Sequence, residues 1–153
     1  MPNTYKTDMQ DAQVSPSAAK RVDGSKSSGR IAFLDATYKT GGGEAAGDTI
    51  DIGELPIGAV LLPDLCRIST DGVGGTSASV AAVGDATDDD RYSASSHALT
   101  AAGSNAVSPV AALMASPWVI TDATKVVKAK LGLGSGSFTS GKIVRFRLAY
   151  LMP

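Results

Sequence analysis

Residues 142–151 alternate between apolar and polar side chains with a period of two. One side of this segment holds four large apolar residues: Val144, Phe146, Leu148 and Tyr150. Arg145 and Arg147 fall on the other side. Because successive side chains of a strand point to opposite faces of a sheet, the pattern predicts a strand with one buried face and one face in solvent.

Other segments with strand character precede this one and are separated by turns rich in glycine and proline. The expected strands cover residues 31–38, 48–53, 59–70, 77–83, 117–121 and 124–131. Pro63 interrupts the third of them, because proline cannot donate to a strand ladder. Residues 92–107 are polar and rich in alanine, which is compatible with a loop or a short helical turn. About seven short strands at this spacing are typical of a β-sandwich or a jelly roll.

The first 30 residues lack this periodicity and contain two prolines and two glycines. Such a segment cannot bury a core of its own. We therefore expect an all-β protein with an extended N-terminal arm over residues 1–30. The remainder, residues 31–153, is expected to form one antiparallel β-sandwich of jelly-roll type.

Composition supports a single domain. The chain has 153 residues, of which 43% are hydrophobic and 5% aromatic, enough for one sizeable core. Cys66 is the only cysteine, so no internal disulfide can form, and no apolar run reaches the roughly 18 residues of a membrane span. Residues 1–10 are polar and do not resemble a secretion signal. These features predict assembly in a reducing cytoplasm and no membrane partner.

Charge is segregated along the sequence. Between positions 35 and 90 there are eleven acidic residues and two basic ones, whereas from position 91 onward there are seven basic residues and one acidic. We expect the two halves to neutralise one another across neighbouring strands. The net charge of −1 and the scarcity of aromatic residues argue against nucleic-acid binding, which needs clustered uncompensated basic side chains.

Two segments resemble known ligand-binding motifs without meeting their requirements. Residues 136–142 look like a phosphate-binding loop, but Ile143 replaces the required Ser or Thr, and a strand follows instead of a helix. A glycine-rich hairpin loop is the preferred interpretation. The acidic residues at positions 85 and 88–90 offer oxygen ligands for a cation without the spacing of a helix–loop–helix calcium site. A solvated acidic loop is preferred, and its simplest role would be pairing with Arg91 or with the basic surface of a partner.

The remaining reactive side chains do not form a recognisable site. His97 is the only histidine and lies in a polar stretch, which predicts a surface position. Cys66 lies in a predicted strand, where a free cysteine usually behaves as a small buried hydrophobe. No nucleophile elbow is present. The sequence thus predicts no enzyme, no cofactor and no bound metal.

Two sets of residues are candidates for binding a protein partner. If the last two expected strands pair as a hairpin, four side chains share one outer face: Lys128, Lys130, Arg145 and Arg147. The alternative is a solvated face balanced by Asp51 and Glu54, since exposed ion pairs contribute little. The arm supplies a second set of candidates: Tyr5, Met9, Val14, Lys20 and Arg21.

Several short segments carry a resemblance in their order along the chain. They read DTIDI at 48–52, LPIGA at 55–59, VGD at 83–85, DDDRY at 88–92 and FRLAY at 146–150. With the arm before them, residues 31–153 resemble the jelly-roll capsid decoration, or cement, proteins of tailed bacteriophages. The resemblance is one of pattern, and it transfers no individual binding residue.

The resemblance implies a structural protein of the virion, assembled in the host cytoplasm. It would decorate and stabilise the capsid as a homotrimer on the outer surface of the major capsid protein shell, with the arm clasping neighbouring subunits. The alternative is a receptor- or carbohydrate-binding β-sandwich of a tail fibre or head fibre. That class would expose Trp or Tyr on a loop or face, whereas Trp118, the only tryptophan, is expected in the core at the start of a strand.

Overall fold

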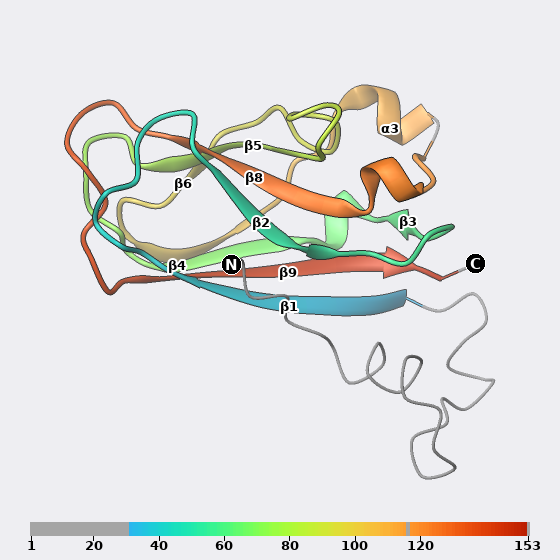
Figure 1. The fold of residues 1–153 in the computed structure, drawn as a ribbon, viewed down its shortest axis with the longest axis horizontal. Helices are drawn as coiled ribbons and strands as arrows, with labels where there is room; N and C mark the ends of the chain where they lie inside the picture. The colour runs from blue at the N-terminus through green and yellow to red at the C-terminus, as the bar shows by residue number, and fades with distance from the viewer. Residues whose placement is uncertain (1–30, 116, 153) are drawn as a thin grey trace, which may run out of the picture.

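The computed structural model describes residues 31–115 and 117–152, which form two antiparallel sheets packed face to face (Figure 1). The expected β-sandwich is therefore confirmed. The arm residues named above, Tyr5, Met9, Val14, Lys20 and Arg21, lie outside the described residues.

The larger sheet has five strands. Four are arranged in the order β1 (Ile31–Lys39), β9 (Ile143–Leu151), β4 (Arg67–Asp71) and β7 (Ala102–Ala106), and β3 (Val60–Leu61) also pairs with β9. The smaller sheet has the order β2 (Thr49–Glu54), β8 (Val126–Gly132), β5 (Ser79–Gly84) and β6 (His97–Ala98). The chain crosses from one sheet to the other at nearly every connection, so strands adjacent in sequence are seldom adjacent in space.

Strand β9 has neighbours on both sides in the five-stranded sheet. It pairs with β1, β3 and β4. The four apolar side chains predicted to face inward are at most 2% exposed: Val144, Phe146, Leu148 and Tyr150. From the facing sheet, Ile50 and Ile52 are also buried, as the alternation of isoleucine with Asp51 along residues 48–53 predicts. Inward-facing residues of both sheets form one hydrophobic core.

Three segments differ from the prediction. The expected long strand over residues 59–70 is divided by the 3-10 helix η1 (Pro63–Leu65), which separates β3 from β4. Residues 92–107 contain β6 and β7, and a short helix, α3 (Ala111–Ala115), follows. Residues 117–121 contribute only a bridge between Val119 and Val60 before the 3-10 helix η2 (Asp122–Thr124). The residues of β7 are small and mostly exposed, so this edge strand carries no apolar alternation.

The two ends of the sandwich have different compositions. One end holds the connections β1–β2, β4–β5 and β8–β9, which are rich in glycine and serine. The other end holds β3, η1, α3, the start of β1 and the C-terminal end of β9 (Figure 1). All four prolines of the described residues, at positions 56, 63, 109 and 117, lie in the connections at this second end.

Candidate functional site

The outer face of the five-stranded sheet carries Arg145 and Arg147, and both are paired. Arg147 lies opposite Asp35 in the register of β1 and β9, and its guanidinium donates to the two carboxylate oxygens at 2.7 and 3.1 Å. Arg145 donates to Asp71 of β4 at 2.8 Å. The bond to Asp35 raises the pKa of Arg147. These pairs are exposed, so each adds little to stability.

Lys128 and Lys130 lie on the other sheet, so the predicted patch of four basic residues is wrong. Lys128 pairs with Asp51 of β2 at 3.2 Å, and Lys130 pairs with Asp89 at 2.5 Å. The cause is the connection between β8 and β9: it crosses the sandwich instead of forming the expected glycine-rich hairpin. Phe138 anchors this crossing, because its side chain is 2% exposed and belongs to the core.

All four basic side chains thus pair with an acidic residue from the acidic stretch at positions 35–90. This arrangement confirms that the acidic and basic halves neutralise one another across strands. These four side chains therefore do not offer the uncompensated positive charge that binding to phosphate would require.

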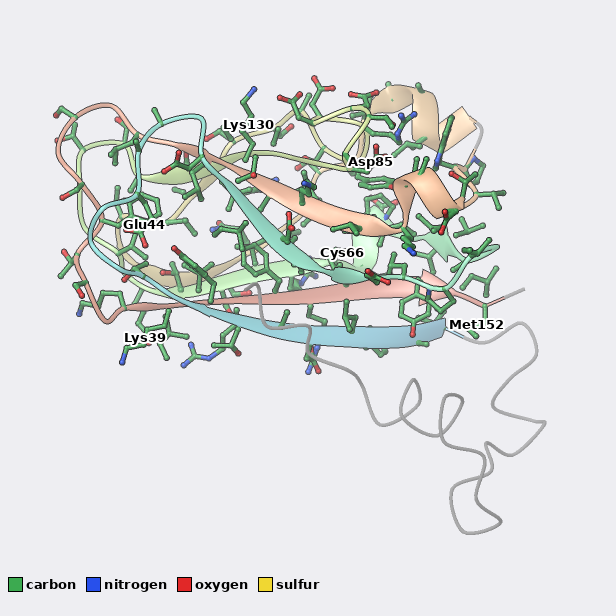
Figure 2. The ribbon with its side chains drawn as sticks, in the orientation of Figure 1. Lys39, Glu44, Cys66, Asp85, Lys130 and Met152 are labelled. Carbon is green, nitrogen blue, oxygen red and sulfur yellow. The ribbon has the colours of Figure 1, made fainter. Side chains whose placement is uncertain are left out.

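The connection after β5 is organised around the buried carboxylate of Asp85 (Figure 2). It accepts hydrogen bonds from the Thr87 amide at 2.8 Å, the Thr87 hydroxyl at 2.6 Å and the Arg91 Nε at 2.6 Å. Burial opposes ionisation of Asp85, but these hydrogen bonds outweigh burial and hold its pKa below the usual value. The expected pairing with Arg91 is confirmed.

Arg91 links this buried carboxylate to Trp118. Its guanidinium carbon lies 4.0 Å from the centre of the indole ring, within the range of a cation–π interaction. Trp118 is 38% exposed, so its expected place in the core is wrong. The segment around it joins no strand apart from the bridge at Val119, and the ring therefore packs on Arg91 at the surface.

Asp88, Asp89 and Asp90 bring three carboxylates within 4.8 Å of one another, which is close enough to share a cation. Asp89 already pairs with Lys130. A hydrogen bond to Asp88, with the charge of its acidic neighbours, raises the pKa of Asp90. The ion pair with Lys130 compensates part of the negative charge of this loop.

His97 is buried, so its predicted surface position is wrong. It lies in β6, where it pairs with Val80 of β5, and its Nε2 is 3.2 Å from the Ser93 hydroxyl. Burial lowers the pKa of His97. A serine next to a histidine is the arrangement of an activated nucleophile, but Ser93 is 0% exposed, and a substrate cannot reach it.

Cys66 is also enclosed, as the sequence predicted. Its thiol is bonded to the Leu62 carbonyl oxygen at 3.4 Å and accepts from the Ala149 amide at 3.3 Å. Burial raises the pKa of Cys66 to about 11. A reactive cysteine needs exposure and a lowered pKa, and this residue has neither.

Exposed large apolar side chains are the feature that the sequence pattern did not reveal. Six are at least 38% exposed among the described residues: Ile31, Phe33, Ile57, Leu65, Trp118 and Val119. All six belong to the proline-containing end of the sandwich or to the first residues of β1. Beside them is an open groove of about 430 Å³, bordered by Leu62, Leu65, Leu113 and Pro117.

Comparison with solved structures identifies relatives in shape. The chain aligns with a chain of the structure described as the capsid of Ralstonia phage GP4, with a TM-score of 0.60 and 20% identity over 82% of this chain and 86% of that one. It aligns similarly with a chain of the cyanophage Pam1 capsid asymmetric unit, with a TM-score of 0.57 and 19% identity over 82% and 87%. This chain shares the fold of chains in phage capsid structures.

The shared fold is the extent of the similarity. No family model matches the sequence, and no curated protein matches it. In the described part of the chain, no helix has the length and apolar character needed to cross a membrane.

Proposed function

We propose that this protein is a structural component of a bacteriophage virion. It decorates and stabilises the capsid by binding the outer surface of the major capsid protein shell. It acts as a homotrimer, with residues 1–30 of each copy clasping neighbouring shell subunits, and it has no enzymatic activity. Assembly takes place in the host cytoplasm.

The observation that carries this proposal is the fold shared with chains of two phage capsid structures. The strand order adds support: apart from the two-residue strand β3, each sheet has four strands, and the connections run mainly across the sandwich, as in a jelly roll. Ser93 and Cys66 are enclosed, which agrees with a binding role.

Trimerisation would give the arm its effect. A single extended segment loses conformational entropy on binding and therefore binds weakly. Once one arm of a trimer is bound, the other two arms are held at a high local concentration near the shell, so the trimer binds more tightly than a single arm does. The arm residues Tyr5, Met9, Val14, Lys20 and Arg21 are the proposed anchors.

The test uses phage particles that lack this protein, obtained by deleting its gene. Full-length protein and a variant without residues 2–29 are each added, and copies per particle are counted by electron microscopy. Full-length protein should occupy the shell, and the truncated variant should melt at the same temperature but occupy far fewer sites. Equal occupancy by both would contradict the role of the arm, and absence of full-length protein from the shell would contradict decoration.

A second candidate function is favoured by one observation, the exposure of Trp118. An exposed aromatic ring is the feature expected of a receptor- or carbohydrate-binding module. Arg91 occupies the space over the ring, so a sugar would have to stack on a part of the indole that Arg91 leaves uncovered. Saturable quenching of Trp118 fluorescence by host surface polysaccharide, together with loss of polysaccharide binding in Trp118→Ala as measured by titration calorimetry, would favour this function over capsid decoration.

A further inference from the structure

We infer that the proline-containing end of the sandwich is a docking surface for the capsid shell, placed directly beside the origin of the N-terminal arm. The inference rests on the proposed function and adds which part of the sandwich faces the shell. The occupant is an uncharged, apolar area of the shell's outer surface.

The strand register places four apolar residues in one row. Ile31 of β1 and Val60 of β3 both lie opposite Leu151 of β9, one on each side, and Val60 is bridged to Val119. Residues directly opposite one another in a sheet point to the same face. Ile31 and Val119 are 46% and 53% exposed, and Leu151 and Val60 between them are partly exposed. The row is therefore a continuous apolar strip across three strands and the segment beside them.

Neighbouring loops extend this strip. The Gly58 amide donates to the Ile120 carbonyl oxygen at 2.8 Å, which holds Ile57 beside the segment of Val119. Ile57 is 61% exposed. Next to Val119 in the chain are Trp118 and Pro117, and Pro117 borders the 430 Å³ groove with Leu65. Monomeric proteins seldom expose a contiguous apolar area of this kind unless it binds something.

Two charged pairs flank the row of apolar residues, and each is closed within the chain. Phe33 marks its boundary, because the Arg147 guanidinium lies 5.7 Å from the Phe33 ring and is paired with Asp35. On the other side, Lys125 pairs with Asp122 at 3.0 Å. Along the row a partner surface therefore meets apolar side chains, and it gains most from the contact if it is apolar too. Asp64, which borders the neighbouring groove, is an exposed charge outside the row.

The place where residues 1–30 join the sandwich favours the capsid shell as the partner that binds this surface. Thirty residues precede Ile31, and Ile31 is itself a member of the apolar row. An arm that binds the shell starts from this end, so the end is held close to the surface that the arm contacts. The glycine-rich connections lie at the other end of the molecule (Figure 1) and would face away from the shell.

The test compares full-length wild type with Val119→Glu and with Ala101→Glu. Val119 and Ala101 are both exposed, and Ala101 lies in the connection between β6 and β7 at the opposite end, so the two variants carry the same added charge. Each protein is titrated onto phage particles that lack it, and bound protein is measured by co-sedimentation. Val119→Glu should weaken binding at least tenfold, while Ala101→Glu should bind as wild type does.

Melting temperature and size-exclusion chromatography with light scattering accompany the titration. Both variants should melt within 2 °C of wild type and have the same oligomeric state. Equal binding by wild type and Val119→Glu would overturn the inference and leave the proposed function standing. Loss of an oligomer in Val119→Glu would also overturn it, by assigning the surface to a second copy. If wild type itself does not bind, the proposed function and this inference fail together.

Discussion

Replacement of Gly84 by alanine tests how the buried Asp85 connection is built. Gly84 ends β5, and a Cβ added there would lie 2.6 Å from the Asp89 carbonyl oxygen and closer still to that of Asp88. Both atoms belong to the backbone, so no side-chain rotation can relieve the overlap. The connection that follows Asp85 would therefore have to move away from the strand until these carbonyl oxygens no longer overlap the added methyl group.

The magnitude follows from two contributions. Forcing an extra methyl group into a packed site costs about 1 to 3 kcal/mol. Moving the connection also disturbs the hydrogen bonds of Asp85, and a bond to a charged group is worth about 1.5 to 3 kcal/mol. Alanine restricts the unfolded chain and returns about 0.4 to 1 kcal/mol. We expect Gly84→Ala to lower the free energy of unfolding by about 2 to 5 kcal/mol, a large share of the roughly 5 to 15 kcal/mol of a typical domain.

The assay is urea denaturation followed by circular dichroism, with Gly103→Ala as the matched control. Gly103 also lies in a strand, β7, but a Cβ there meets nothing within 4 Å. The control should be neutral or slightly more stable, by up to about 1 kcal/mol. If Gly84→Ala unfolds at the same urea concentration as wild type, or if both variants are equally destabilised, then the close approach of Gly84 to the backbone of Asp88 and Asp89 does not require glycine at position 84.

Three further predictions concern buried polar groups. Asp85→Asn should lower the free energy of unfolding by about 2 to 4 kcal/mol, because Arg91 loses the partner that compensates its burial. Trp118 fluorescence should also shift as Arg91 is released, and an unchanged emission spectrum with an unchanged urea midpoint would contradict the connection between Asp85, Arg91 and Trp118. Cys66 should not react with a disulfide reagent at pH 8 in the folded protein but should react in denaturant, since burial raises its pKa to about 11; rapid native labelling would show that it is accessible. The pKa of His97 is lowered by burial, so stability should be complete above about pH 6.5, where the unfolded state is neutral too, and should fall below it as only the unfolded state gains the proton. His97→Gln should lose this part of the decline in melting temperature, and an unchanged pH profile would show that His97 does not cause it.

Much of the fold could be predicted because large apolar side chains alternate in several strands. In β9 and β2 the alternation gave the inward-facing residues correctly. Alternation identifies a face of a strand but does not say which sheet contains it. Strands β8 and β9 both alternate and lie ten residues apart, so a hairpin was expected where the chain crosses the sandwich. The single signal for the crossing was Phe138, a large apolar residue within a glycine- and serine-rich loop.

The candidate site was less predictable, because its contacts join residues far apart in the sequence. His97 has only small and polar neighbours, and its burial depends on pairing with β5. The exposure of Trp118 depends on Arg91, whose orientation is set in turn by Asp85. Ile31, Val60 and Val119 look unremarkable one at a time, and only the strand register brings them into one row.

The apolar row and the Gly84 contact are expected to separate binding from folding. Val119 and Ile57 are more than half exposed, so the sandwich gains little stability from them, and their apolar character is not explained by folding. Gly84 is buried beneath the connection after β5 and contributes no side chain to the row. If the docking surface is assigned correctly, Val119→Glu should lose the shell and keep its melting temperature. Gly84→Ala should melt earlier and, below its transition, should still bind the shell, because three of the four residues of the row lie on β1, β3 and β9, none of which adjoins Gly84.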